Sequence, residues 1–103
     1  MFVTHVTFNL SGIDEKAYQG AVKDLAPSYA NVPGLVSKVW IKQSDKGVYG
    51  GIYYWDSEAS YDKYMSSDLY KAVSTHPNLI NFNTACYNDV VEGTSVTKGV
   101  CKL

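Results

Sequence analysis

The sequence PGLVSKVWIKQSDKGVYGGIYYWDSEASYDKY at positions 33–64 decides the fold of this chain. Residues 35–42 and 48–55 both show the alternation of side chains that is typical of β-strands. The polar residues between them end in Gly47, which can take the positive φ that a tight hairpin turn needs. The dipeptide Asp56-Ser57 then offers N-caps for a helix. The stretch therefore predicts an antiparallel hairpin followed at once by a helix.

Two details of this hairpin bear on the rest of the molecule. Strict alternation assigns the first strand's side chains to two faces, with Val36, Lys38 and Trp40 on one and Leu35, Val39 and Ile41 on the other. The pair Gly50-Gly51 lies inside the second strand, where glycine marks a bulge, a bend or a close approach to the backbone. Because no phosphate-binding sequence accompanies this pair, we interpret it as a structural bend or bulge.

The composition limits the classes of protein to which the chain can belong. Its length of 103 residues predicts one domain over residues 1–103. Nine Lys and Arg balance ten Asp and Glu without a basic cluster, which argues against nucleic-acid binding. No apolar run approaches the roughly 20 residues of a membrane span, and the N-terminus begins directly in a strand pattern, so we expect a cytoplasmic protein.

Metal and cofactor motifs are not recognisable in the sequence. The chain has two histidines, His5 and His76, so a three-histidine site within one chain is excluded. Cys86 and Cys101 lack the paired spacing of a zinc or redox site, and no phosphate-binding loop is present. We therefore expect neither a metal nor a cofactor.

The remaining segments complete the pattern of elements. Residues 2–10 alternate as a strand with one strongly apolar face, and His5 lies on the more polar face. A helix is predicted from residue 13 to about residue 31, kinked or ended by Pro27. The second helical segment, from about residue 57, is broken before a further strand over residues 79–88. Residues 89–103 form either an exposed C-terminal arm or a fifth strand laid on a partner.

The order β-α-β-β-α-β is that of an α+β ferredoxin-like fold, with an antiparallel sheet and the helices on one face. The other face of such a sheet is bare, and Leu35, Val39 and Ile41 are assigned to it. A second, identical subunit packed on that face gives a two-fold homodimer, which is a dimeric α+β barrel.

The side chains that can carry chemistry are an aromatic set with a few polar tips. Such sets form pockets for apolar ligands, although the same rings can equally be the core between sheet and helices. Lys38 shares the face of Trp40, where it either reaches the sheet edge or places a positive charge near an anionic substrate. His76 precedes Pro77 in a polar loop, where we expect it to be exposed to solvent.

The motifs PGLVSKVWI and GGIYYWDSEASYDKYM resemble those of the YdhR-type monooxygenase family, whose pattern runs PG-x3-KVW, a turn and then GGIY. The resemblance covers residues 32–65 well and the flanking residues in outline. It implies a dimeric α+β barrel, a superfamily that includes cofactor-free monooxygenases of anthrones and related phenols. The superfamily also contains cyclases, isomerases and heme-handling proteins.

A second resemblance is to cyclases of the olivetolic acid type in the same superfamily. It implies acid/base roles for a first-strand histidine, here His5, and for a tyrosine of the second helical segment, here Tyr64. The position of the family's further histidine is near Tyr70. Because a tyrosine is a poor base near neutral pH, this cyclase mechanism is only partly supported.

We therefore predict a homodimeric, cofactor-free monooxygenase that binds a small aromatic, phenolic or polyketide-like substrate between sheet and helices. The alternatives are a non-oxidative cyclase, lyase or isomerase, or a non-catalytic protein that binds an apolar metabolite or heme. The hypothesis requires His5 to face the aromatic side chains. The predicted catalytic residues are His5, Tyr64 and Tyr70, and the predicted substrate-binding residues are Lys38, Trp40, Tyr53, Trp55 and Tyr61.

Overall fold

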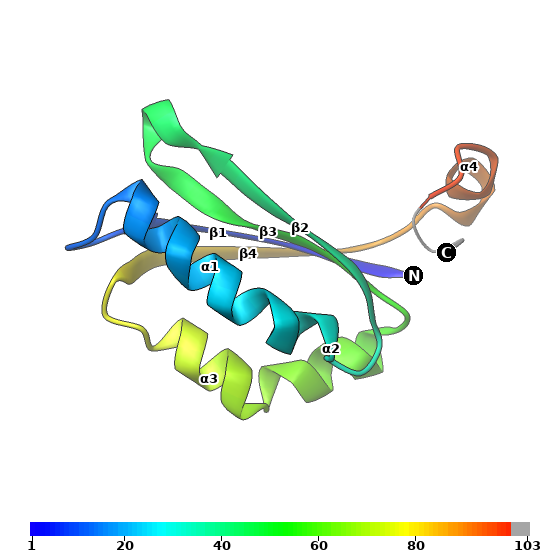
Figure 1. The fold of residues 1–103 in the computed structure, drawn as a ribbon. Coiled ribbons are helices and arrows are strands. Elements are labelled where there is room, and N and C mark those ends of the chain that lie inside the picture. Colours follow the sequence, from blue (N-terminus) through cyan, green and yellow to red (C-terminus); the bar gives the residue numbers. More distant parts are fainter. Residues whose placement is uncertain (100–103) are drawn as a thin grey trace.

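The computed structural model describes residues 1–99, and its centre is a four-stranded antiparallel sheet (Figure 1). The strands are β1 (Phe2–Leu10), β2 (Leu35–Gln43), β3 (Val48–Trp55) and β4 (Leu79–Asn88). Their order across the sheet is β2-β3-β1-β4, so that β2 and β4 are the two edges. This arrangement confirms the predicted ferredoxin-like fold.

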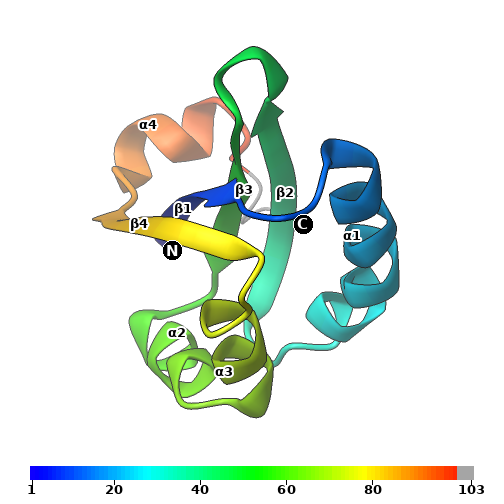
Figure 2. The same cartoon turned by 90° about the vertical axis from the view of Figure 1, so that its left-hand side faces the viewer.

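The helical layer covers one face of the sheet. Its members are α1 (Glu15–Ala30), α2 (Glu58–Met65) and α3 (Asp68–Ser74). Figure 2, turned by 90°, shows α1 and the α2–α3 pair on the same side of the sheet, and none of these three helices lies on the opposite face. As predicted, the second helical segment is broken in two, and the hydroxyls of Ser57 and Ser67 cap its two halves.

Pro27 lies inside α1 and does not end it. Proline removes one backbone hydrogen bond from a helix and disfavours continuation. Two residues later, however, Tyr29 is only 3% exposed and packs in the core between α1 and the sheet. Burial of this ring holds the last turn of the helix on the sheet.

The hairpin between β2 and β3 has the predicted turn and an unpredicted bulge. Residues Ser44–Lys46 form a short 3-10 turn, η1, and Gly47 follows with φ 64°. The register of β2 on β3 shifts between Leu35 and Ser37. This bulge reverses the alternation at its start, so Leu35 packs in the core and Val36 is exposed. The sequence-based faces of these two residues were therefore wrong.

Gly50 and Gly51 contain no bulge, because the pairing of β3 with β1 and with β2 runs through them without a shift. The register shifts lie elsewhere, between Leu35 and Ser37 and between Thr7 and Asn9. A Cβ at Gly50 would collide with the carbonyl group of Val6 on the neighbouring strand. Gly50 therefore marks a close approach of two backbones, and of the predicted bend or bulge the bulge was wrong.

The core between the sheet and the helices is mainly aromatic. Trp55 is fully buried, and its indole nitrogen donates a hydrogen bond of 3.1 Å to the hydroxyl of Thr4. Its ring stacks on Tyr53 with an interplanar angle of 3°. Buried aromatic pairs of this kind contribute about 0.5–1.5 kcal/mol beyond the area they bury.

The C-terminal segment leaves the sheet after β4 and forms a short helix, α4 (Val91–Val96), which stands apart from the other helices (Figure 1). Its Val91 and Val96 are 60% and 81% exposed. Cys86 is a free, exposed thiol, and Cys101 lies outside the described residues. Among the described helices, none is both long and apolar enough to cross a membrane.

Candidate functional site

A cavity of about 140 Å³ lies between α1, the sheet and the segment that joins α3 to β4. Its volume is close to that of a cavity of about 150 Å³ that accommodates benzene. Most of its lining is aliphatic or aromatic, including Phe8, Val22 and Leu25. The polar groups of this lining belong to the following residues: Tyr18, Tyr29, Lys38, Trp40, Tyr53 and His76. An apolar wall with a few polar groups is the usual construction of a small-molecule site.

Lys38 reaches this cavity from the edge strand β2. Its Nζ atom lies 3.3 Å from the ring centroid of Trp40, 3.4 Å from that of Tyr29 and 4.5 Å from that of Tyr53. No carboxylate of the described residues is within ion-pair distance of this amine. A lysine that is neither paired nor fully solvated is an unusual group in a protein interior.

Burial and the surrounding rings act on Lys38 in opposite directions. Burial disfavours the ammonium ion and lowers the pKa of Lys38 to about 7. The π faces of the rings favour the ammonium ion by about 0.5–2 kcal/mol. Both protonation states are consequently accessible near neutral pH, which is the condition for a lysine that accepts a proton.

The tyrosines of the site are hydrogen-bond donors rather than bases. The hydroxyl groups of Tyr29 and Tyr64 lie 2.7 Å apart, and both side chains are buried. Burial is the main cause that raises the pKa of Tyr29, Tyr53 and Tyr64 above the ordinary value for tyrosine. These side chains therefore stay protonated at neutral pH.

His76 is exposed, as predicted, yet it also lines the cavity. Its Nδ1 atom accepts a hydrogen bond of 3.1 Å from the backbone N–H of Asn78. This contact fixes the ring and leaves Nε2 as the nitrogen that can meet a ligand. His76 therefore places an ionisable group where the cavity reaches the surface.

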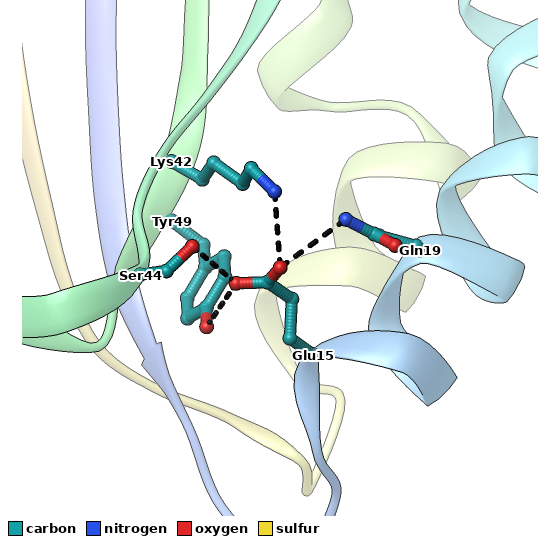
Figure 3. Close-up of polar contacts among 5 residues, drawn as sticks. All are labelled: Glu15, Gln19, Lys42, Ser44 and Tyr49. Atoms are coloured by element: carbon teal, nitrogen blue, oxygen red, sulfur yellow. Dashed lines mark hydrogen bonds and ion pairs between the residues drawn. The ribbon is translucent and has the colours of Figure 1, made fainter.

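A polar cluster closes the hairpin end of the site (Figure 3). The Glu15 carboxylate accepts hydrogen bonds from Lys42 (3.0 Å), Ser44 (2.5 Å) and Tyr49 (3.0 Å), and from Gln19 on the next turn of α1 (3.3 Å). The hydrogen bonds from Ser44, Lys42 and Tyr49 lower the pKa of Glu15 to about 2. The cluster joins the start of α1 to the β2–β3 hairpin.

The residues predicted to bind or transform a substrate do not all share one cavity. Lys38, Trp40 and Tyr53 line the main cavity. An adjoining void of about 30 Å³ is lined by Tyr61, Tyr64 and Tyr70, and also by Tyr53. Trp55 lines neither space, because it is fully buried in the core.

His5 lies on the open face of the sheet. Along β1, Thr4, Val6 and Phe8 point towards the helices and line the cavity or the void, whereas His5 and Thr7 line a shallow hollow on the opposite face. Within one chain, His5 therefore does not meet Tyr64 and Tyr70, which the hypothesis required. A catalytic role for His5 stays a prediction.

The sequence-based prediction left out Tyr18, Tyr29 and His76. Tyr18 and Tyr29 are eleven positions apart, which is close to three whole helical turns and places them on one face of α1. That spacing was a usable signal. His76 carried no such signal, because only the return of the chain from α3 to β4 brings its loop to the cavity.

An outer groove lies on the other side of Lys38, at the free edge of β2. It is lined by Ala26, Tyr29, Ala30, Leu35, Val36, Ser37, Lys38 and Trp40. Lys38, Tyr29 and Trp40 thus border both the inner cavity and this groove.

Residues 3–100 match the family described as "Putative mono-oxygenase ydhR". The chain belongs to this family. The match extends well beyond the motifs of residues 32–65 and confirms the resemblance to YdhR-type proteins. It also confirms the class of function that the resemblance implied, which is that of a putative monooxygenase. No curated protein sequence matches this YdhR-family chain.

Solved structures with the same fold are distant in sequence. A putative antibiotic biosynthesis monooxygenase from Deinococcus radiodurans is 14% identical, with a TM-score of 0.71 over 86% of this chain and 92% of that one. A variant of SnoaB, a cofactor-independent oxygenase from Streptomyces nogalater, is 17% identical, with a TM-score of 0.68 over 86% and 93%. A variant of MhuD with two manganese protoporphyrin IX molecules per active site is 13% identical, with a TM-score of 0.70 over 87% and 95%. At these identities the likeness shows a shared fold.

Proposed function

We propose that this YdhR-family protein is a cofactor-independent monooxygenase of a small phenolic or polyketide-like aromatic compound, and that Lys38 removes the substrate's proton. The observation that carries this proposal is the unpaired amine of Lys38 among three aromatic rings at the wall of the cavity. The family match and the printed activity of SnoaB support the reaction class.

Proton removal is the step for which the cavity is suited. The neutral amine of Lys38 takes a proton from an acidic C–H or O–H of the substrate and becomes an ammonium ion. Because this ammonium ion has no carboxylate partner among the described residues, the substrate anion becomes its counter-ion. The ion pair forms inside an apolar wall, where such an attraction is stronger than in water.

Oxygenation then follows from the chemistry of an electron-rich carbanion. For a substrate with an activated CH₂ group, the carbanion transfers electrons to O₂ and forms a C–O bond, which gives a peroxide. Proton return from Lys38 gives the hydroperoxide, which loses water to leave a C=O group. The sum is CH₂ + O₂ → C=O + H₂O, so O₂ is the sole oxidant and no external reductant takes part.

The tyrosine pair and His76 have supporting roles in this proposal. Tyr29 borders the cavity, and its hydroxyl is hydrogen-bonded to that of Tyr64, so Tyr64 acts on a ligand through Tyr29. Tyr70 packs edge-on against the Tyr64 ring. His76 is positioned to exchange protons with solvent at the exposed side of the cavity.

The test is oxygen uptake with 4-hydroxyphenylacetonitrile, a one-ring phenol with an activated CH₂ group that suits the size of the cavity, in the wild-type protein and two Lys38 variants. Lys38→Met keeps an apolar stem but removes the base, and Lys38→Arg keeps a positive charge that cannot be released. Both should lower kcat by about 10²–10⁴-fold, the usual contribution of a general base. Full activity in Lys38→Arg would show that only charge is needed, and full activity in Lys38→Met would refute the proposal.

Two further measurements separate the alternatives. Loss of turnover in His5→Ala with Lys38→Met active would favour the first-strand histidine as the base. Substrate conversion without O₂ uptake would indicate a cyclase, lyase or isomerase. Heme titration followed by visible spectra tests the non-catalytic alternative.

We also propose a homodimer formed through the open face of the sheet. A row of paired residues crosses the centre of this face, from Val39 through Ile52 and His5 to Ala85. Val39 is 46% exposed, and its neighbours Ile52 and Ala85 in the row are also apolar. A second copy of the chain would cover this row, including His5, and would remove the apolar surface from water.

A further inference from the structure

The hydroxyl of Tyr18 is buried and has no hydrogen-bond partner. Tyr18 is 8% exposed, and among buried side-chain polar atoms of residues 1–99 its oxygen is the one without a partner. A buried polar group left in this state destabilises the folded chain. Tyr18 lines the cavity of the proposed site, so a ligand bound there can supply the missing partner.

The surroundings of Tyr18 make its hydroxyl a donor. Burial, followed by the neighbouring Tyr29 and Tyr49, raises the pKa of Tyr18 to about 12. The rings of Phe8 and Tyr49 hold the Tyr18 ring at centroid distances of 5.8 and 5.1 Å. A protonated phenol fixed in this way offers one O–H group in a defined position.

The hydroxyl of the neighbouring Tyr49 already has a partner. Tyr49 is in ring contact with Tyr18, but its hydroxyl donates to the Glu15 carboxylate at 3.0 Å. Glu15 is itself held by Lys42 and Ser44. The cluster at the hairpin therefore occupies the Tyr49 hydroxyl and leaves the Tyr18 hydroxyl without this partner.

Tyr18 and Lys38 approach the cavity from different ends of α1. Tyr18 is in the first turns of the helix, whereas Lys38 packs on Tyr29 in its last turns. Aliphatic side chains, including Val22 and Leu25, line the cavity between them. A ligand that contacts both groups therefore needs a polar function at each end of an apolar body, and an aromatic ring with two oxygen functions meets this requirement.

We infer that Tyr18 is the specificity-determining residue of this site, and that the substrate is a hydroxyaryl compound with a second, acceptor oxygen across the ring from its ionisable group. The second oxygen accepts the hydrogen bond of Tyr18 while the ionisable group meets Lys38. This inference rests on the proposed function of the cavity, but its test measures binding alone.

The experiment compares two phenols of nearly equal shape, 4-methoxyphenol and 4-ethylphenol, which differ by an ether oxygen in place of a CH₂ group. Their Kd values are measured by calorimetry at pH 8 with wild-type protein, with Tyr18→Phe and with Tyr87→Phe. Tyr87 is 55% exposed and outside the cavity, so its variant controls for loss of a tyrosine hydroxyl. Wild type and Tyr87→Phe should both prefer 4-methoxyphenol.

In Tyr18→Phe this preference should fall by on the order of tenfold, because the ether oxygen loses its donor and the cavity keeps its shape. The unfolding temperature of Tyr18→Phe should be unchanged or higher, since an unsatisfied hydroxyl has been removed. An equal preference in wild type and Tyr18→Phe would overturn the inference, as would failure of wild type to bind either phenol. A shifted preference together with normal oxygen uptake in Lys38→Met would sustain the role of Tyr18 and refute only the proposed base.

Discussion

A Cβ atom placed on Gly51 would lie 2.9 Å from the Cε atom of Lys38. Because Gly51 has no side chain, the Lys38 side chain can lie over this position of β3 and reach the rings of Trp40, Tyr29 and Tyr53. The two glycines of β3 thus have different roles: Gly50 allows close packing of β3 on β1, and Gly51 leaves room for the Lys38 side chain.

Gly51→Ala should therefore lower turnover without unfolding the protein. The strand backbone is held by pairing on both sides, so the flexible lysine moves instead, towards water, and its pKa rises towards the ordinary value. We expect kcat to fall at neutral pH and to recover as the pH is raised. Gly20→Ala is the matched control, because nothing lies within 4 Å of a Cβ at this position in α1, and it should raise stability by about 1 kcal/mol. Equal activity of Gly51→Ala and wild type at every pH would contradict this account.

The buried amine of Lys38 should make stability depend on pH in a defined direction. The pKa of Lys38 is about 7 in the folded chain and near 10.5 when unfolded, so the unfolded chain binds the extra proton between these values. The free energy of unfolding of wild type should therefore rise relative to that of Lys38→Met as the pH goes from about 7 towards 10.5. The slope is at most about 1.4 kcal/mol per pH unit. Urea denaturation of both proteins from pH 6 to 9.5 measures it, and parallel curves would show that Lys38 titrates normally.

Glu15 should also make stability rise with pH, but in the acidic range, and because its lowered pKa stabilises the folded chain. Its pKa is lowered from 4.5 to about 2, so the stabilisation that it provides is complete above about pH 4.5 and is lost as the pH falls towards 2. Glu15→Gln should lower the unfolding temperature at pH 7, and the difference from wild type should vanish near pH 2. Glu92→Gln is the control, because Glu92 is exposed and is not part of the Glu15 cluster. A difference that persists at pH 2 would mean that packing, rather than charge, is responsible.

The proposed dimer can be broken at the centre of the open face. Val39→Glu places a charge in the apolar row that a second copy would bury, and an unpaired buried charge strongly disfavours association. We expect wild type to sediment as a dimer and Val39→Glu as a folded monomer. Ser28→Glu, which places the same charge on an exposed residue of α1 on the other side of the sheet, should leave the dimer intact. A monomeric wild type would contradict the proposal.

Most of the fold could be predicted from the sequence, because each strand alternates in its own short window and α1, α2 and α3 begin after the capping residues Asp14, Ser57 and Ser67. The strands over residues 2–10, 48–55 and 79–88 have the bounds that alternation indicated. The bulge after Leu35 could not be predicted in this way. Two apolar residues in succession fit either register, and only packing against the helices decides which of them is buried.

The candidate site was predictable only in part, because it depends on contacts between distant segments. Lys38, Trp40 and Tyr53 come from the adjacent strands β2 and β3, and local alternation places all three on one face. The same alternation placed His5 on the polar face of β1, whereas the helices cover the apolar face that contains Phe8. Tyr18 becomes informative only when its missing partner is known, and a sequence does not show which hydroxyls are satisfied.

The position of Lys38 on an edge strand has a consequence for the catalytic cycle. Its amine borders the inner cavity on one side and the outer groove on the other. An amine that is protonated in the resting protein can thus lose its proton to bulk water through the groove after the substrate has filled the cavity. Filling the groove with Ala30→Phe should then slow the first turnover at pH 6, where Lys38, with a pKa of about 7, begins protonated, but not at pH 8. Equal slowing at both pH values would show that the groove is not the route of this proton.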